Sequence, residues 1–117
     1  MRYTMTSAPY ADPAAAFSIT SRPTTAGIRL AVNGEIDMYT AGHLGRAMAG
    51  ALRTGAAELL VDLALTTFCD CGGITTLLSA RHNAAGRTTF QVTNPTGLPL
   101  RVLQTLGVYA LLTTRSR

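Results

Sequence analysis

The stretch ELLVDLA, residues 58–64, is a short and almost continuous apolar run near the middle of the chain. Such a run is typical of a strand that is covered on both faces. It is too short to cross a membrane, and Arg, Asp, Glu or Thr interrupts every other apolar run before it reaches the roughly 18 residues that a span requires. We therefore expect residues 58–64 to form the central strand of a sheet.

The segments before this strand predict a hairpin and a helix. FSITSR and GIRLAVNGEID alternate apolar with polar residues and are separated by Pro23, which predicts two strands in a β-hairpin. Thr40 is a favourable N-cap for a helix over 41–54, where apolar residues recur at helical spacing. Gly55 ends this helix.

The segments after the central strand continue the alternation. A second helix is expected from residue 71 or 72 to about 83, and RTTFQVTN alternates as a strand that ends at the Asn94-Pro95 turn. A third helix over 98–106 is closed by Gly107, and VYALLTTRSR adds a short helix or an edge strand. This order predicts an α/β layer with a mixed sheet.

The length of 117 residues and the 47% apolar composition predict one globular domain. We expect a flexible N-terminus over 1–14, which is rich in Ala, Pro, Thr and Ser, a domain over 15–112, and a basic C-terminal tail over 113–117. The N-terminus has no sustained apolar segment typical of a secretory signal. We therefore expect a cytoplasmic protein with reduced thiols and no membrane partner.

The net charge of +4 comes from ten Arg and six acidic residues. Without Arg2, Arg115 and Arg117 in the expected tails, and without Asp12, seven Arg face five acids. These Arg are scattered and lack interleaved aromatic residues, which argues against a nucleic-acid partner. A basic surplus can help association with an acidic partner, but the sequence does not say which Arg would do so.

The stretch FCDCGGIT, residues 68–75, raises the question of metal or thiol chemistry. Its Cys-x-Cys spacing, with His43 and His82 far away in sequence, fits neither a zinc site nor a thioredoxin-like redox pair. We predict no metal and no cofactor. Cys71 at a helix N-terminus is a candidate reactive thiol, although Asp70 beside it opposes a lowered pKa. The alternative is that these small residues only permit a tight turn into the helix.

Three segments, VNGEIDMYTAGHL (32–44), LLVDLALTTFCDCGGITTLLSA (59–80) and QVTNPTGLPLRVLQTLGV (91–108), together resemble the STAS domain of bacterial anti-sigma-factor antagonists. The resemblance covers about residues 16–112. It implies a STAS-like α/β fold with a mixed sheet of four to five strands, an N-terminal β-hairpin, and three to four helices packed mainly on one face.

In that family a strand ending in Val-Asp-Leu is followed by Asp-Ser-Ser-Gly, and the second serine is phosphorylated by a partner that is both anti-sigma factor and serine kinase. This chain is similar, with VDL at 61–63 and DCGG at 70–73, but Gly72 stands at the phosphorylated position. Glycine has no oxygen to accept a phosphoryl group, and the thiol of Cys71 is not an expected substrate. The resemblance therefore implies a phosphorylation switch that has lost its acceptor, and with it the added charge of about −1.5 to −2.

A helical wheel places small polar residues on the outer face of the second helix, opposite Ile74, Leu77 and Leu78. These are Gly72, Thr75, Thr76, Ser79 and Asn83. The resemblance implies that this face meets the anti-sigma factor, and the alternative is an ordinary solvated face. Thr75 and Thr76 are candidate alternative phosphorylation sites.

In the resembled family the GEID loop lies near the phosphorylation loop, at the same end of the sheet, which implies that Asp37, Tyr39 and Thr40 touch the partner. Alternatively, Asp37 and Thr40 only organise the start of the first helix. The predicted partner-binding residues are Asp37, Tyr39, Thr40, Asp70, Cys71, Gly72, Thr75, Thr76 and Ser79.

We expect a non-enzymatic antagonist, monomeric or weakly dimeric, that binds an anti-sigma factor of the ATPase/serine-kinase type and releases a sigma factor. One alternative is a STAS scaffold of another signalling or transport-linked assembly. Another is a thiol sensor that uses Cys71.

Overall fold

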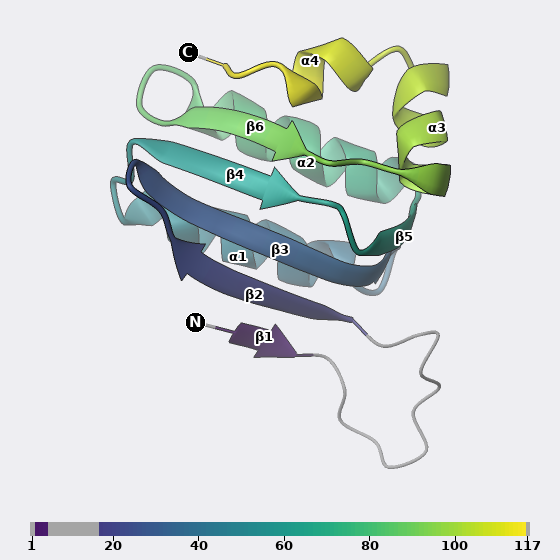
Figure 1. The fold of residues 1–117 in the computed structure, drawn as a ribbon, viewed down its shortest axis with the longest axis horizontal. Coiled ribbons are helices and arrows are strands. Elements are labelled where there is room, and N and C mark those ends of the chain that lie inside the picture. The colour runs from purple at the N-terminus through teal and green to yellow at the C-terminus, as the bar shows by residue number, and fades with distance from the viewer. Residues whose placement is uncertain (1, 5–16, 117) are drawn as a thin grey trace.

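Six strands and four helices alternate along residues 2–4 and 17–116, which are the residues that the computed structural model describes (Figure 1). In chain order they are β1 (Arg2–Thr4), β2 (Ser18–Pro23), β3 (Gly27–Ile36), α1 (Ala41–Arg53), β4 (Glu58–Asp62), β5 (Thr66–Cys69), α2 (Cys71–Ala84), β6 (Thr89–Thr93), α3 (Gly97–Thr105) and α4 (Tyr109–Thr113). The three helices expected from the sequence lie within one or two residues of their predicted bounds. The chain's last segment adds a short helix, α4.

The strands form one mixed sheet in the order β1-β2-β3-β4-β6, and β5 pairs with β3 outside this path. The β2–β3 hairpin is antiparallel, whereas β4 and β5 run parallel to β3, and β6 runs parallel to β4. The predicted mixed α/β fold and its hairpin are confirmed. Strand β1 was not expected, because residues 2–4 fall in the predicted flexible N-terminus, whose residues 1 and 5–14 lie outside the described part.

Helices α1 and α2 cover one face of the sheet (Figure 1). Alternate strand residues point into this layer and are buried, among them Val32, Val61 and Phe90. The residues between them, such as Leu60 and Asp62, lie half-buried on the opposite face. The expectation that residues 58–64 are covered on both faces is therefore only partly right: β4 is central, but its side chains alternate between a face covered by the helices and a face that is only partly covered, where Glu58 is buried and Leu60 and Asp62 are half-buried.

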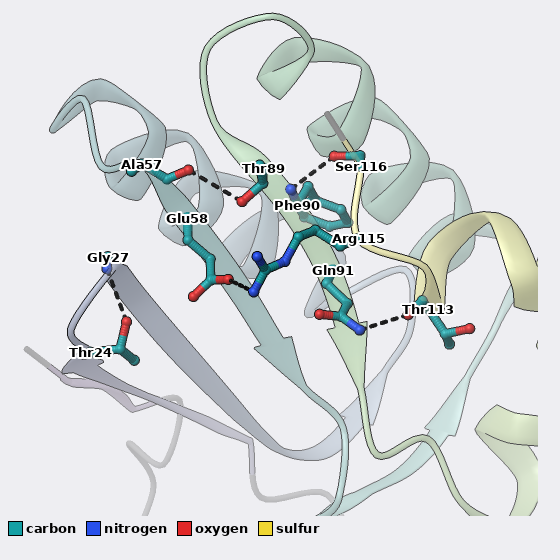
Figure 2. Close-up of polar contacts among 10 residues, drawn as sticks. All are labelled: Thr24, Gly27, Ala57, Glu58, Thr89, Phe90, Gln91, Thr113, Arg115 and Ser116. Atoms are coloured by element: carbon teal, nitrogen blue, oxygen red, sulfur yellow. Dashed lines mark hydrogen bonds and ion pairs between the residues drawn. The ribbon is translucent and has the colours of Figure 1, made fainter.

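The C-terminal residues pack beside β6 (Figure 2). The backbone N–H of Phe90 donates to Ser116 Oγ over 2.8 Å, and the Ser116 N–H donates to the Phe90 carbonyl oxygen over 3.0 Å. Arg115 forms an ion pair of 2.6 Å with the buried carboxylate of Glu58. The segment predicted as a basic tail thus begins within α4 and is bonded to the sheet as far as residue 116.

Candidate functional site

The break in the chain's pairing between β4 and β5 brings the GEID loop, which follows β3, close to the DCGG stretch at the start of α2. The Asp62 carboxylate accepts hydrogen bonds from the Ala64 N–H at 2.9 Å and from Arg29 at 2.6 Å, which fixes the turn that leaves β4. The chain then returns as β5 alongside the end of β3, where Cys69 lies opposite Ile36 in the register. Because β5 runs directly into α2, the start of this helix lies beside the loop that follows β3.

Asp70 caps α2 and ties it to β3. Its side chain accepts a hydrogen bond of 2.9 Å from the Gly73 N–H, and its own N–H donates to the Ile36 carbonyl oxygen over 3.1 Å. A Cβ at position 73 would lie 2.7 Å from Cys69 Sγ and 2.7 Å from Ile36 Cγ2, so only glycine fits there. At Gly72 a Cβ would meet only Asp70 Oδ1, at 3.3 Å. The two glycines therefore have different roles. Packing requires glycine at position 73, whereas Gly72 leaves the first turn of α2 with an exposed surface that carries no side chain.

The two cysteines of this stretch lie in opposite environments. Cys69 is buried, and this burial, together with the nearby Asp70 and Cys71, raises the pKa of its thiol to about 12. Cys71 is exposed at the first residue of α2, and neither cysteine forms a disulfide. Within the described part of the chain, no three His, Cys, Asp or Glu side chains gather in a way that could hold a metal ion.

The loop that connects β3 to α1 is held by internal hydrogen bonds. Asp37 Oδ1 accepts from the backbone N–H groups of Tyr39 and Thr40, at 2.9 and 3.1 Å. The Thr40 hydroxyl accepts from the Asp37 N–H and donates to the Glu35 carbonyl oxygen over 2.7 Å. Thr40 is the N-cap residue of α1, as expected, but its hydroxyl is engaged within the loop and makes no capping hydrogen bond. Thr40 is only 8% exposed, and its side chain organises the loop.

Two large side chains project from the tip of this loop. Met38 and Tyr39 are each 78% exposed, the highest values among the large apolar side chains of the described residues. Tyr39 was expected at the site, but the sequence reasoning missed Met38. The signal that could have identified it is an apolar pair, Met-Tyr, between the Asp that follows a strand and the start of a helix, where polar residues are more usual.

The outer face of α2 has the predicted composition. Thr75, Ser79 and Gly72 are exposed, whereas Ile74 and Leu77 are buried. The hydroxyl groups of Thr75 and Thr76 each donate over 2.9 Å to a backbone carbonyl four residues earlier in the helix, those of Cys71 and Gly72. The first turns of this face therefore carry no charge beyond Asp70, and their threonine hydroxyls are already hydrogen-bonded.

No helix in the described ranges, 2–4 and 17–116, is both long and apolar enough to cross a bilayer. Helix α2, the longest of them, has 14 residues, against the roughly 20 that a transmembrane helix needs.

A family model described as "Mlab, STAS domain" matches residues 19–113. No curated protein matches the sequence. Solved structures that are similar in fold at low sequence identity include three that are described as anti-sigma or antisigma factor antagonists.

The structure from Mycobacterium paratuberculosis has a TM-score of 0.77 and 23% identity, over 91% of this chain and 86% of that one. The unphosphorylated form of SpoIIAA has a TM-score of 0.63 and 20% identity, over 82% of this chain and 85% of that one. A STAS domain from Rhodobacter sphaeroides has a TM-score of 0.53 and 14% identity, over 67% of this chain and 86% of that one. At these identities the likeness establishes a common fold. Since the family model also covers most of the sequence, this chain belongs to the STAS domain family.

Proposed function

We propose that this STAS domain is a non-enzymatic anti-sigma-factor antagonist that acts in the cytoplasm. It binds an anti-sigma factor of the ATPase/serine-kinase type and thereby releases a sigma factor. The observation that carries the proposal is the juxtaposition of the bare first turn of α2 with the exposed tip of the β3–α1 loop. The fold shared with structures described as anti-sigma factor antagonists supports the same role.

The two parts of this surface suit different contributions to binding. Tyr39 and Met38 offer large exposed side chains, and residues of this kind often supply most of the binding energy of an interface. Gly72, Thr75 and Ser79 form a smooth, uncharged helix surface that a partner's backbone can approach closely. Asp70 and Cys71 lie at the N-terminus of α2, between these two parts in sequence, and they complete the proposed contact area.

Gly72 makes the interaction insensitive to phosphorylation at the usual motif position. Thr75 is the better alternative acceptor because it is exposed, whereas Thr76 is half-buried. Both hydroxyls are hydrogen-bonded within the helix, and a kinase would have to break that bond before phosphoryl transfer. We therefore propose a constant antagonist that is controlled by its abundance.

Binding to purified ATPase-fold anti-sigma factors, measured by calorimetry, tests the proposal. The expected result is a saturable complex that Tyr39→Ala weakens and Leu98→Ala does not, since Leu98 is also exposed but lies on α3. Failure to bind any of these anti-sigma factors would count against the antagonist role.

The missing acceptor at Gly72 also favours a second candidate, a STAS scaffold in another signalling or transport-linked assembly. Neighbouring genes discriminate between the two, because sigma or anti-sigma genes support the antagonist and transport genes support the scaffold. A third candidate function is a thiol sensor that uses the exposed thiol of Cys71. An iodoacetamide titration midpoint near the ordinary thiol value of about 8.5 would argue against it.

A further inference from the structure

The charges of this domain are segregated between its layers. Helices α1 and α2 contain no Asp or Glu, but they carry Arg46, Arg53 and Arg81, and Arg87 follows α2 closely. Two of the acidic residues in the described part, Glu58 and Asp62, are in the sheet, where each is paired with an Arg. The other three, Glu35, Asp37 and Asp70, lie at the end of β3 and at the two helix starts. The helix layer is therefore positively charged from its middle to the C-terminal ends of α1 and α2.

A groove runs between α1 and α2 on this positive layer. One hollow of about 240 Å³ is lined by residues from both helices, and a second of about 230 Å³ continues it toward their C-terminal ends. Ala49, Leu52 and Asn83 line both hollows, so the two are contiguous. Gly45 and Ser79 line the first hollow, and these small residues, with Ala49, leave room for another chain.

Two arginines line the far end of this groove, Arg53 on α1 and Arg87 after α2. Both are exposed, and neither forms an ion pair with another residue in the described ranges. Arg87 donates one hydrogen bond, of 2.9 Å, to the Asn83 carbonyl oxygen at the end of α2. Guanidinium groups bind carboxylates with two parallel hydrogen bonds, and so an acidic side chain entering the groove would meet favourable partners.

We propose that the α1–α2 groove binds an acidic helical segment of a partner protein. Small residues let a helix approach a helix pair closely, and the arginine charge is complementary to Glu or Asp on the incoming segment. A nucleic acid fits less well, since no aromatic side chain lines the groove for base stacking. A membrane also fits less well, because no exposed large apolar side chain of the described residues lies on α1 or α2.

The groove adjoins the proposed anti-sigma-factor surface through Thr75, Thr76 and Ser79. The inference rests on the proposed function only for the identity of the partner, because the chemistry of the segment follows from the groove itself. It also assigns a role to part of the basic surplus, which the sequence alone left unassigned.

Titration of the ¹⁵N-labelled chain with an end-blocked helical peptide of repeated Glu-Ala-Ala-Ala units tests the groove. Amide signals of Ala49, Ser79 and Asn83 should shift, and a Lys-Ala-Ala-Ala peptide should leave them in place. R53E/R87E should weaken peptide binding by about tenfold or more. R53Q/R87Q, a milder change, should weaken it less. The matched control R22E/R101E changes two exposed arginines on β2 and α3 and should bind as the unaltered chain does.

Three outcomes would overturn the proposal. The first is the absence of shifts in the groove with the acidic peptide, and the second is equal shifts with the lysine peptide. The third is a groove that responds to a DNA duplex or to phosphatidylglycerol vesicles but not to the acidic peptide. Since no anti-sigma factor is present in this experiment, its failure is distinct from failure of the proposed antagonist role.

Discussion

The backbone N–H of Asp70 donates a hydrogen bond of 3.1 Å to the carbonyl oxygen of Ile36. This bond joins the last residue before α2 to the last residue of β3, and it continues the parallel pairing of β3 with β5. The loop that carries Met38 and Tyr39 is therefore held beside the N-terminus of α2 before any partner binds. A preformed surface of this kind loses less conformational entropy on binding than a flexible one.

Gly73→Ala should destabilise the domain by about 1–3 kcal/mol, since its new methyl group would lie 2.7 Å from Cys69 Sγ and Ile36 Cγ2. Gly72→Ala is the matched control, because its methyl group meets only Asp70 Oδ1 at 3.3 Å. It should change stability by no more than about 1 kcal/mol, with alanine's better helix propensity as the favourable term. Urea unfolding followed by circular dichroism measures both. Equal stability of the two variants would contradict the tight packing at Gly73.

Stability should fall in acid partly through Asp62. Burial acts to raise the pKa of this carboxyl, but hydrogen bonds from the Ala64 N–H, Arg29 and Asn94 outweigh it and hold the pKa below its ordinary value. The stabilisation is thus fully present above the unfolded-state pKa of about 4, and it is lost as the pH falls through the lower folded-state pKa.

Asp62→Asn should lower stability at pH 7 by about 1–3 kcal/mol and should flatten the acid dependence. Urea midpoints measured from neutral pH down into the acid range test this prediction. Glu35→Gln controls for the removal of a carboxylate elsewhere, since the Glu35 side chain forms no ion pair with another described residue. A variant that loses stability in acid as steeply as the unaltered chain would show that Asp62 does not contribute.

The helices and the hairpin could be predicted from the sequence because their signals are local. Apolar spacing, Gly55 and Gly107 marked the helix bounds, and alternation around Pro23 marked the hairpin. Strand β5 could not be predicted in this way, since its four residues, TTFC, have no length over which a period shows. Its existence depends on pairing with β3, including the bond from the Thr66 hydroxyl to the Val32 carbonyl oxygen.

The site was predicted in part, for the same reason. The polar outer face of α2 follows from helical spacing and is found in the structure, whereas the capping role of Asp70 was not predicted. The hydroxyl of Thr40 has the right position for a cap, but the Asp37 N–H competes for its oxygen as an acceptor, and the hydroxyl itself donates to the Glu35 carbonyl oxygen. Such competition depends on how the loop folds back on β3, which residue type and spacing do not encode.

Iodoacetamide should modify one cysteine in the folded protein and two in the unfolded protein. Cys71 is exposed, whereas burial first, and then the nearby Asp70 and Cys71, raises the pKa of the Cys69 thiol to about 12. The reactive thiolate is therefore scarce at Cys69 at any ordinary pH. Mass spectrometry of the native and urea-unfolded protein reads the stoichiometry, and Cys71→Ser should remove the native label. Modification of Cys69 in the folded protein would mean that the N-terminus of α2 unfolds locally with ease.

Ser116→Ala should destabilise the domain by about 1–3 kcal/mol, because it leaves the buried N–H of Phe90 without its hydrogen-bond acceptor. Thr114→Ala is the matched control, since Thr114 is exposed and close in sequence. Thermal unfolding of the two variants compares them directly. If both unfold at the temperature of the unaltered chain, the C-terminal residues do not stabilise the edge of β6.

The central claim concerns Gly72 and is tested by binding to an ATPase/serine-kinase-type anti-sigma factor before and after incubation with ATP. The unaltered chain should bind equally tightly in both conditions and gain no phosphoryl group. Gly72→Ser restores the acceptor at an exposed position, where the new Cβ meets only the Asp70 carboxylate, so it should be phosphorylated and then bind more weakly. Calorimetry combined with intact mass gives both readings. A lack of binding by the unaltered chain, or its phosphorylation and release in ATP, would contradict a constantly active antagonist.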